Sequence, residues 1–154
     1  MSGLPFRRLS NGEAGNLTKP FSLQEVKQAV WDCDGSKSPG PDGVSFDFIK
    51  QFWDLLKDDV MRFLVEFHRN GKPTKGLNST FIALITKVNS PQRLNDFRPI
   101  SLVGYLYKVL AKVLANRLRA VIGSVVSDSQ STFVKGKQIL DEILIDEARR
   151  FGGR

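Results

Sequence analysis

Two cations separated by a short polar segment are the residues in this sequence best suited to chemistry. Lys87 follows a short apolar run, 81–85, which is long enough for a buried strand and too short for a helix. Arg98 precedes Pro99, which holds it in an extended or turn conformation. On two adjacent strands, the ammonium of Lys87 would supply a point charge and the guanidinium of Arg98 would bind a phosphate through two parallel hydrogen bonds. We therefore predict a polyphosphate-binding pair on a short β-hairpin around 80–102. The alternative is a surface hairpin with two solvated cations.

A second segment, 34–43, has the strongest turn chemistry in the chain. Its three glycines permit positive φ, and its two prolines fix φ and remove two amide donors. The expected result is a stiff loop in which Ser36, Lys37 and Ser38 offer backbone amides and one cation to a phosphate. A plain loop between helices is the alternative.

Apolar periodicity predicts helices around these two segments. Ser22 and Glu25 have the spacing of a capping box, so a helix is expected from there to about Trp31. Residues 1–19 show no sustained period and are expected to be irregular. Residues 20–154 are expected to form the folded part, which makes the chain α+β and mostly helical.

A long amphipathic stretch runs from about 45 to 69, and its aromatic stripe is interpreted as core. Gly71 and Pro73 are expected to end it. Asp58 and Asp59 are the candidate break between two helices. Further helices are expected over 106–122 and 138–150.

The helix expected over 106–122 carries the best basic face in the sequence. Lys108, Lys112 and Arg119 fall close together opposite the apolar arc, with no acidic residue interleaved for i,i+4 pairing. Arg117 falls inside the apolar arc. It either extends its head to solvent or pairs with a buried acceptor.

Composition narrows the class of protein. The 154 residues are 41% hydrophobic and 25% charged, as in an ordinary globular chain, but the net charge is +7. A strongly basic chain without a basic amphipathic terminal helix favours nucleic acid over a membrane as partner. A single cysteine, Cys33, excludes an internal disulfide, and His68 as the only histidine excludes a His-based metal site or triad. No signal peptide is visible, so we expect an intracellular protein of the nucleus or cytoplasm that is not secreted.

Three motifs in this order resemble plant LINE-type (non-LTR) retrotransposon reverse transcriptases from about Phe6 to Arg150. The hairpin motif reads Phe-Ile-Ala-Leu-Ile-Thr-Lys and then Asp-Phe-Arg-Pro-Ile-Ser-Leu, with Thr86 where the family usually has Pro. The resemblance implies that Lys87 and Arg98 lie against the triphosphate of an incoming deoxynucleotide.

The other two motifs imply contact with nucleic acid. The string Lys-Ser-Pro-Gly-Pro-Asp-Gly at 37–43, which includes Gly40, resembles the family segment that covers the template-primer. The segment 130–141 resembles the second fingers motif, which packs near the template strand. The nucleic-acid-binding residues expected from the motifs and the basic face are Ser36, Lys37, Ser38, Gly40, Lys108, Lys112, Gln130, Lys135 and Lys137.

The resemblance covers the fingers and the start of the palm. The two palm motifs that carry the metal-binding aspartates, and the thumb, are missing from the sequence, so we assign no catalytic residue and no metal ligand. Asp141, Asp146 and Glu147 are interpreted as solvated helix charges. No cofactor is expected on this fragment, since Mg²⁺ belongs to a complete family enzyme.

The resemblance implies a truncated RNA-directed DNA polymerase. Its expected partners are an RNA template or RNA–DNA hybrid and, weakly, a deoxynucleoside triphosphate. The alternatives are a freestanding basic nucleic-acid-binding module and a non-functional retroelement relic.

Overall fold

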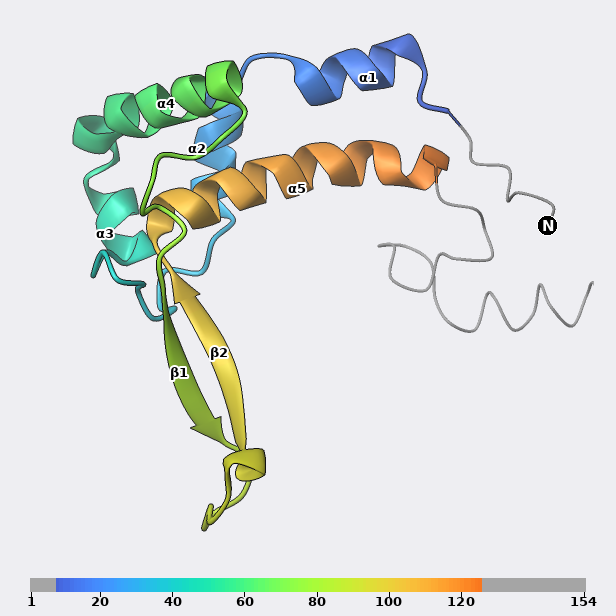
Figure 1. The fold of residues 1–154 in the computed structure, drawn as a ribbon. Helices are drawn as coiled ribbons and strands as arrows, with labels where there is room; N and C mark the ends of the chain where they lie inside the picture. The colour runs from blue at the N-terminus through green and yellow to red at the C-terminus, as the bar shows by residue number, and fades with distance from the viewer. Residues whose placement is uncertain (1–7, 126–154) are drawn as a thin grey trace, which may run out of the picture. The chain divides into compact units, whose positions relative to one another are not determined.

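The protein has an α+β fold in which helices dominate, as the sequence predicts. The structure is a computed structural model that describes residues 8–125. The helices are α1 (Asn11–Thr18), α2 (Leu23–Trp31), α3 (Phe46–Gln51), α4 (Trp53–Asn70) and α5 (Tyr105–Val125), and the strands are β1 (Thr80–Thr86) and β2 (Phe97–Val103) (Figure 1). In this described part of the chain no helix is both long enough and apolar enough to cross a lipid bilayer.

The chain divides into two compact units. Among the described residues, the larger unit comprises 20–114, and the smaller one comprises 8–19 with 115–125. The larger unit holds one hydrophobic core, to which α2, α3, α4 and the first part of α5 contribute. Its buried members are Phe21, Val26, Ala29, Val30, Phe46, Ile49, Trp53, Val60, Phe63, Leu64, Val109, Leu110 and Val113.

Helix α2 forms where the sequence predicts it. The hydroxyl of Ser22 accepts a hydrogen bond from the backbone N–H of Glu25 at 3.2 Å, which satisfies one free donor of the first turn. Phe21 and Val26 flank this cap and are both buried, as expected of a hydrophobic staple. The cap and the staple together fix where α2 begins.

The break in the long amphipathic stretch lies at Phe52, so the expected break at 58–59 is wrong. Phe52 has φ −104° and ψ 24°, and α4 continues unbroken through the two aspartates. The two carboxylates face solvent, so they can be accommodated within α4 at little cost in stability. The turn at Phe52 lets both Ile49 and Trp53 reach the core. Gly71 ends α4, as predicted, and it does so in the left-handed conformation at φ 65°.

Residues 11–18 form α1, although the sequence suggested no regular structure there. Ser10 and Glu13 make a complete capping box: the Glu13 backbone N–H donates to the Ser10 hydroxyl, and the Ser10 N–H donates to the Glu13 carboxylate. The helix has no buried residue, so it lacks the apolar period that would have revealed it.

The hairpin forms with the predicted strands but without the predicted burial. β1 and β2 pair antiparallel, with Thr80 opposite Val103 and Thr86 opposite Phe97. Six of the seven β1 residues are exposed. The expectation of a buried strand is wrong because, among the described residues, the sheet has only these two strands. In Figure 1 the two-stranded hairpin extends as a narrow ribbon away from the helices of the larger unit.

Candidate nucleic-acid interface

The register of the hairpin puts Lys87 and Arg98 on the same face. Arg98 lies opposite Ile85, and Lys87 follows Ile85 by two residues. Opposite residues in an antiparallel pair share a face, and so do residues two apart along a strand. The two cations are therefore diagonal neighbours across the ribbon. This is the arrangement expected for the pair.

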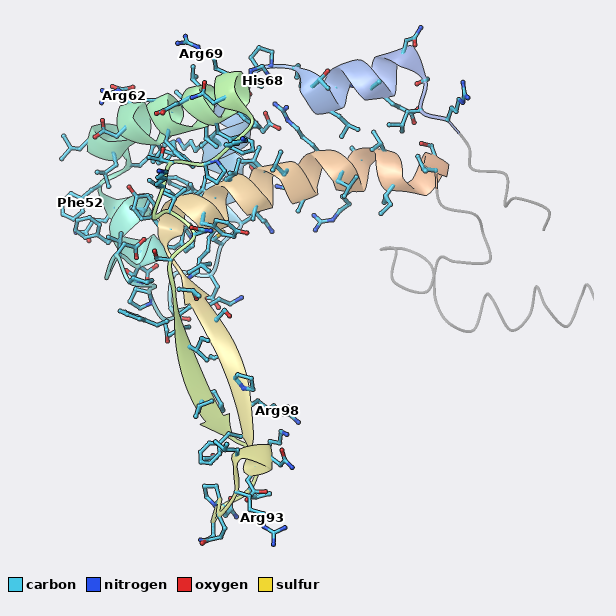
Figure 2. All side chains as sticks on the ribbon, viewed as in Figure 1. Phe52, Arg62, His68, Arg69, Arg93 and Arg98 are labelled. Atoms are coloured by element: carbon cyan, nitrogen blue, oxygen red, sulfur yellow. The ribbon has the colours of Figure 1, made fainter. Side chains whose placement is uncertain are left out.

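Both cations are exposed at the end of the ribbon that is far from the helices. Figure 2 shows Arg98 there, with Arg93 in the adjoining loop. The Nζ of Lys87 donates to the carbonyl of Asn95 at 2.8 Å, so the ammonium is held over the loop. The site can therefore present two positive charges to an anion, and its role with a triphosphate stays a prediction.

Asp96 organises the loop between the two cations, a role that its place in the sequence did not reveal. Its carboxylate accepts hydrogen bonds from the backbone N–H groups of Gln92 and Arg93, each at 2.9 Å. These bonds favour the ionised form and lower the pKa of Asp96 below its usual value. The sequence signal that could have indicated this role is an aspartate at the end of a polar loop, because aspartate side chains often accept hydrogen bonds from nearby backbone N–H groups.

The turn-rich loop engages its own donors, which corrects one expectation. The backbone N–H and the hydroxyl of Ser36 both donate to Asp34, at 3.0 and 2.8 Å. These bonds lower the pKa of Asp34, the hydroxyl bond more than the backbone bond. The Ser36 amide is therefore used within the loop and is not held ready for a phosphate. Lys37 and Ser38 remain exposed.

Gly40 is buried, so its predicted place on a binding surface is also corrected. A Cβ atom on Gly40 would collide with the backbone of Val103 and Gly104. Glycine is needed here because the loop backbone lies directly against the junction of β2 and α5. Asp42 reaches the same junction, where its carboxylate accepts from the Tyr105 N–H at 2.6 Å. The loop is thus the support for the hairpin and α5.

Two lysines of the expected basic face have partners within the larger unit. The Nζ of Lys108 donates to the Ser38 carbonyl at 3.1 Å. The Nζ of Lys112 lies 3.8 Å from the Asp32 carboxylate at the end of α2. The sequence showed no acidic residue at i,i+4 on α5, and the acid is instead Asp32, which caps the C-terminal end of α2. Lys108 therefore ties the loop to α5, and contact of either lysine with nucleic acid stays a prediction.

Several predicted positions lie outside the described residues. They are Gln130, Lys135, Lys137, Asp141, Asp146, Glu147 and the helix expected over 138–150. Within residues 8–125, no three His, Cys, Asp or Glu side chains gather as metal ligands would.

The single histidine and the single cysteine have structural surroundings. His68 is exposed near the end of α4, and its ring stands edge-on to Phe21 at 5.8 Å between centroids. Cys33 is half-buried, and burial raises the pKa of its thiol, which disfavours the reactive thiolate. Neither residue lies on the hairpin that carries Lys87 and Arg98.

The chain is similar to retrotransposon proteins over most of its length. It is 33% identical over 155 residues to the uncharacterized 149 kDa protein of transposon TX1 from Xenopus laevis, covering 97% of this chain and 12% of that protein. It is 28% identical over 130 residues to a retrovirus-related Pol polyprotein from the type-1 retrotransposable element R1 of Bradysia coprophila, covering 81% of this chain and 13% of that protein. No family model matches the chain. The chain is therefore retrotransposon-related, and it spans about an eighth of the length of these relatives.

Proposed function

We propose that this chain is the fingers and the start of the palm of a non-LTR retroelement reverse transcriptase, of the LINE type found in plants. In this proposal it binds template-primer and the phosphates of an incoming deoxynucleotide, and other parts of a longer polymerase supply the catalytic aspartates and their metal ions. The similarity to a Pol polyprotein supports the polymerase class.

The observation that carries the proposal is the diagonal placement of Lys87 and Arg98 on one exposed face of the hairpin. A triphosphate carries several negative charges along a short chain, which suits one compact ammonium and one planar guanidinium placed diagonally on one face. The hydrogen bond from Lys87 to the loop carbonyl and the Asp96 bonds hold the tip in one conformation. A preorganised tip loses less conformational entropy on binding.

The template side of the proposal rests on the loop that contacts α5. Lys37 is exposed beside Ser38, whose carbonyl accepts from Lys108. A charged loop fixed to a helix can follow a sugar-phosphate backbone without reading bases, so binding should be independent of sequence. Counterion release should then make the affinity fall steeply with salt.

Nucleotide binding provides the direct test. The double variant Lys87→Ala, Arg98→Ala should lose binding of a deoxynucleoside triphosphate, measured by NMR titration. The affinity of the unaltered protein should be weak, near millimolar or about 4 kcal/mol, because metal ions take the other side of a triphosphate in a complete enzyme. The matched control is Lys57→Ala, Arg62→Ala on α4, which removes the same charge from side chains paired with Asp54 and Asp59. Equal losses in both double variants would contradict a specific site.

A freestanding nucleic-acid-binding module is the second candidate, favoured by the net charge of +7. This module would bind RNA in a salt-dependent way that the two double variants weaken equally, and it would not bind a triphosphate. A relic without function would bind neither RNA nor a triphosphate. The chain alone should not extend a primer, and extension that survives changes at Asp141 and Asp146 would contradict the assignment of catalysis to other parts.

A further inference from the structure

β1 has an outer edge whose backbone groups are unpaired among the described residues. The Lys87 N–H donates to the opposite Asp96 carbonyl at 2.6 Å, so this is a hydrogen-bonded pair. Such pairs alternate along an antiparallel ladder. The backbone groups of residues 81, 83 and 85 therefore point toward β2. Those of 80, 82, 84 and 86 point outward, where a further strand could bond them.

β2 is not equivalent to β1 at its own outer edge. Pro99 lies opposite Leu84, at a position where the backbone N–H would point outward. Proline has no N–H, so the middle of this edge lacks a donor and resists strand addition. Only the β1 edge is free of proline.

β1 also exposes apolar side chains on both of its faces. Phe81 and Ile85 lie on one face, 59% and 49% exposed, and Ile82 and Leu84 lie on the other, 68% and 52% exposed. A two-stranded ribbon buries little of such surface, and isolated ribbons are marginally stable in water. Adding strands beside β1 would cover part of both faces at once.

The sequence of β1 is self-complementary when the strand is reversed. It reads Thr-Phe-Ile-Ala-Leu-Ile-Thr, with Ala83 at the centre. In an antiparallel pair of two copies about Ala83, Thr80 lies opposite Thr86, Phe81 opposite Ile85, and Ile82 opposite Leu84. The last of these pairs joins positions whose backbone groups both point outward, so the hydrogen-bonding register agrees with the side-chain register.

Charge does not oppose a second copy at this edge. Two molecules of net charge +7 repel one another, but β1 contains no charged residue. In the register about Ala83, Lys87 lies opposite Ser79 of the other copy and not opposite a cation. Like charges facing one another across strands would be destabilising.

We propose that two copies of this chain associate through β1, antiparallel about Ala83, to form a four-stranded sheet. The contact is isologous and closed, because both outer edges of that sheet are the β2 strands that carry Pro99. Opposite residues share a face, so both Lys87–Arg98 pairs lie on the same face of the sheet, one toward each end. The association does not depend on the proposed polymerase function.

Sedimentation equilibrium of the full chain over a range of concentrations tests this interface. Leu84→Pro removes an outward N–H that β2 does not use, and should weaken dimerisation at least about tenfold. The matched control is Ser101→Pro, which removes the corresponding outward N–H from β2, since Ser101 lies opposite Ile82. This control should leave the dimer unchanged.

A charge pair separates loss of the interface from loss of the fold. Ala83→Lys places two cations together at the two-fold axis, and Ala83→Asp places two anions there, so each variant alone should be monomeric. An equimolar mixture should recover a heterodimer. An unaltered chain that stays monomeric at every concentration overturns the proposal. So does a dimer that Leu84→Pro leaves intact, or a mixture that does not associate.

Discussion

The carboxylate of Asp42 accepts a hydrogen bond from the backbone N–H of Tyr105 at 2.6 Å, across 63 residues of sequence. Tyr105 is the first residue of α5, where backbone N–H groups have no partner within the helix. The same carboxylate accepts from the Val44 N–H at 3.2 Å. One side chain thus fixes its own loop and caps the helix that follows the hairpin.

Removing this cap should destabilise the larger unit. We expect Asp42→Ala to lower the free energy of unfolding by about 1 kcal/mol, the usual cost of losing a helix N-cap. Urea denaturation followed by circular dichroism measures it. Asp58→Ala, an exposed change on α4, is the control and should stay within about 0.5 kcal/mol of the unaltered protein. An equal effect of both changes would argue against the cap.

A methyl group at Gly40 should separate the loop from the junction of β2 and α5. Gly40→Ala forces the added Cβ into the backbone of Val103, which cannot rotate away as a side chain could. We expect a loss of about 1–3 kcal/mol in the free energy of unfolding. Gly123→Ala is the control, because it lies in α5 with no atom within 4 Å of the added Cβ. That change should be neutral or stabilising by up to about 1 kcal/mol.

Arg117 should determine how well α1 is formed. It is 8% exposed, and its guanidinium donates to the carbonyls of Leu17 and Lys19 at 3.1 and 2.6 Å. The buried guanidinium therefore pairs with backbone carbonyls of half-buried Leu17 and exposed Lys19, so of the two alternatives left by the sequence the structure favours pairing. The bonds satisfy carbonyls at the C-terminal end of α1, where a cation is also favoured by the helix dipole.

We expect Arg117→Met to lower the local stability of α1 by about 2 kcal/mol. This loss corresponds to amide exchange in α1 that is roughly thirtyfold faster. Hydrogen exchange of a peptide spanning 11–18 measures the effect. Arg119→Met is the control, since Arg119 bonds Asn116 on its own helix. Unchanged protection of α1 in Arg117→Met would show that the bonds contribute little.

The hairpin loop should loosen in acid. The pKa of Asp96 is lowered by the Gln92 and Arg93 amides, so its ionised form stabilises the loop. This contribution is fully present above the unfolded value of 3.8 and is lost as the pH falls through the lower folded value. Amide resonances of Gln92 and Arg93 should therefore shift below pH 3.8 in a titration followed by NMR. In Asp96→Asn they should show no such transition.

Local sequence chemistry predicted the elements that local chemistry controls. Ser22 and Glu25 fixed the start of α2, and Gly71 fixed the end of α4, because caps act within one turn. The strands around Lys87 and Arg98 were also predicted, since short apolar runs and a proline leave few other conformations. Once the register is known, period-two alternation is enough to put the two cations on one face.

Only the tertiary structure shows which residues from distant parts of the chain pack against these elements, cap them or pair with them. The sequence could not show that Gly40 packs on Val103, that Asp42 caps α5, or that Asp32 pairs with Lys112, because these partners are far apart in the chain. The same holds for the exposure of β1. An apolar run reads as buried, yet burial depends on whether another element covers the strand. Sequence period determined the faces of the hairpin, and only three-dimensional packing decided that both faces of β1 remain exposed.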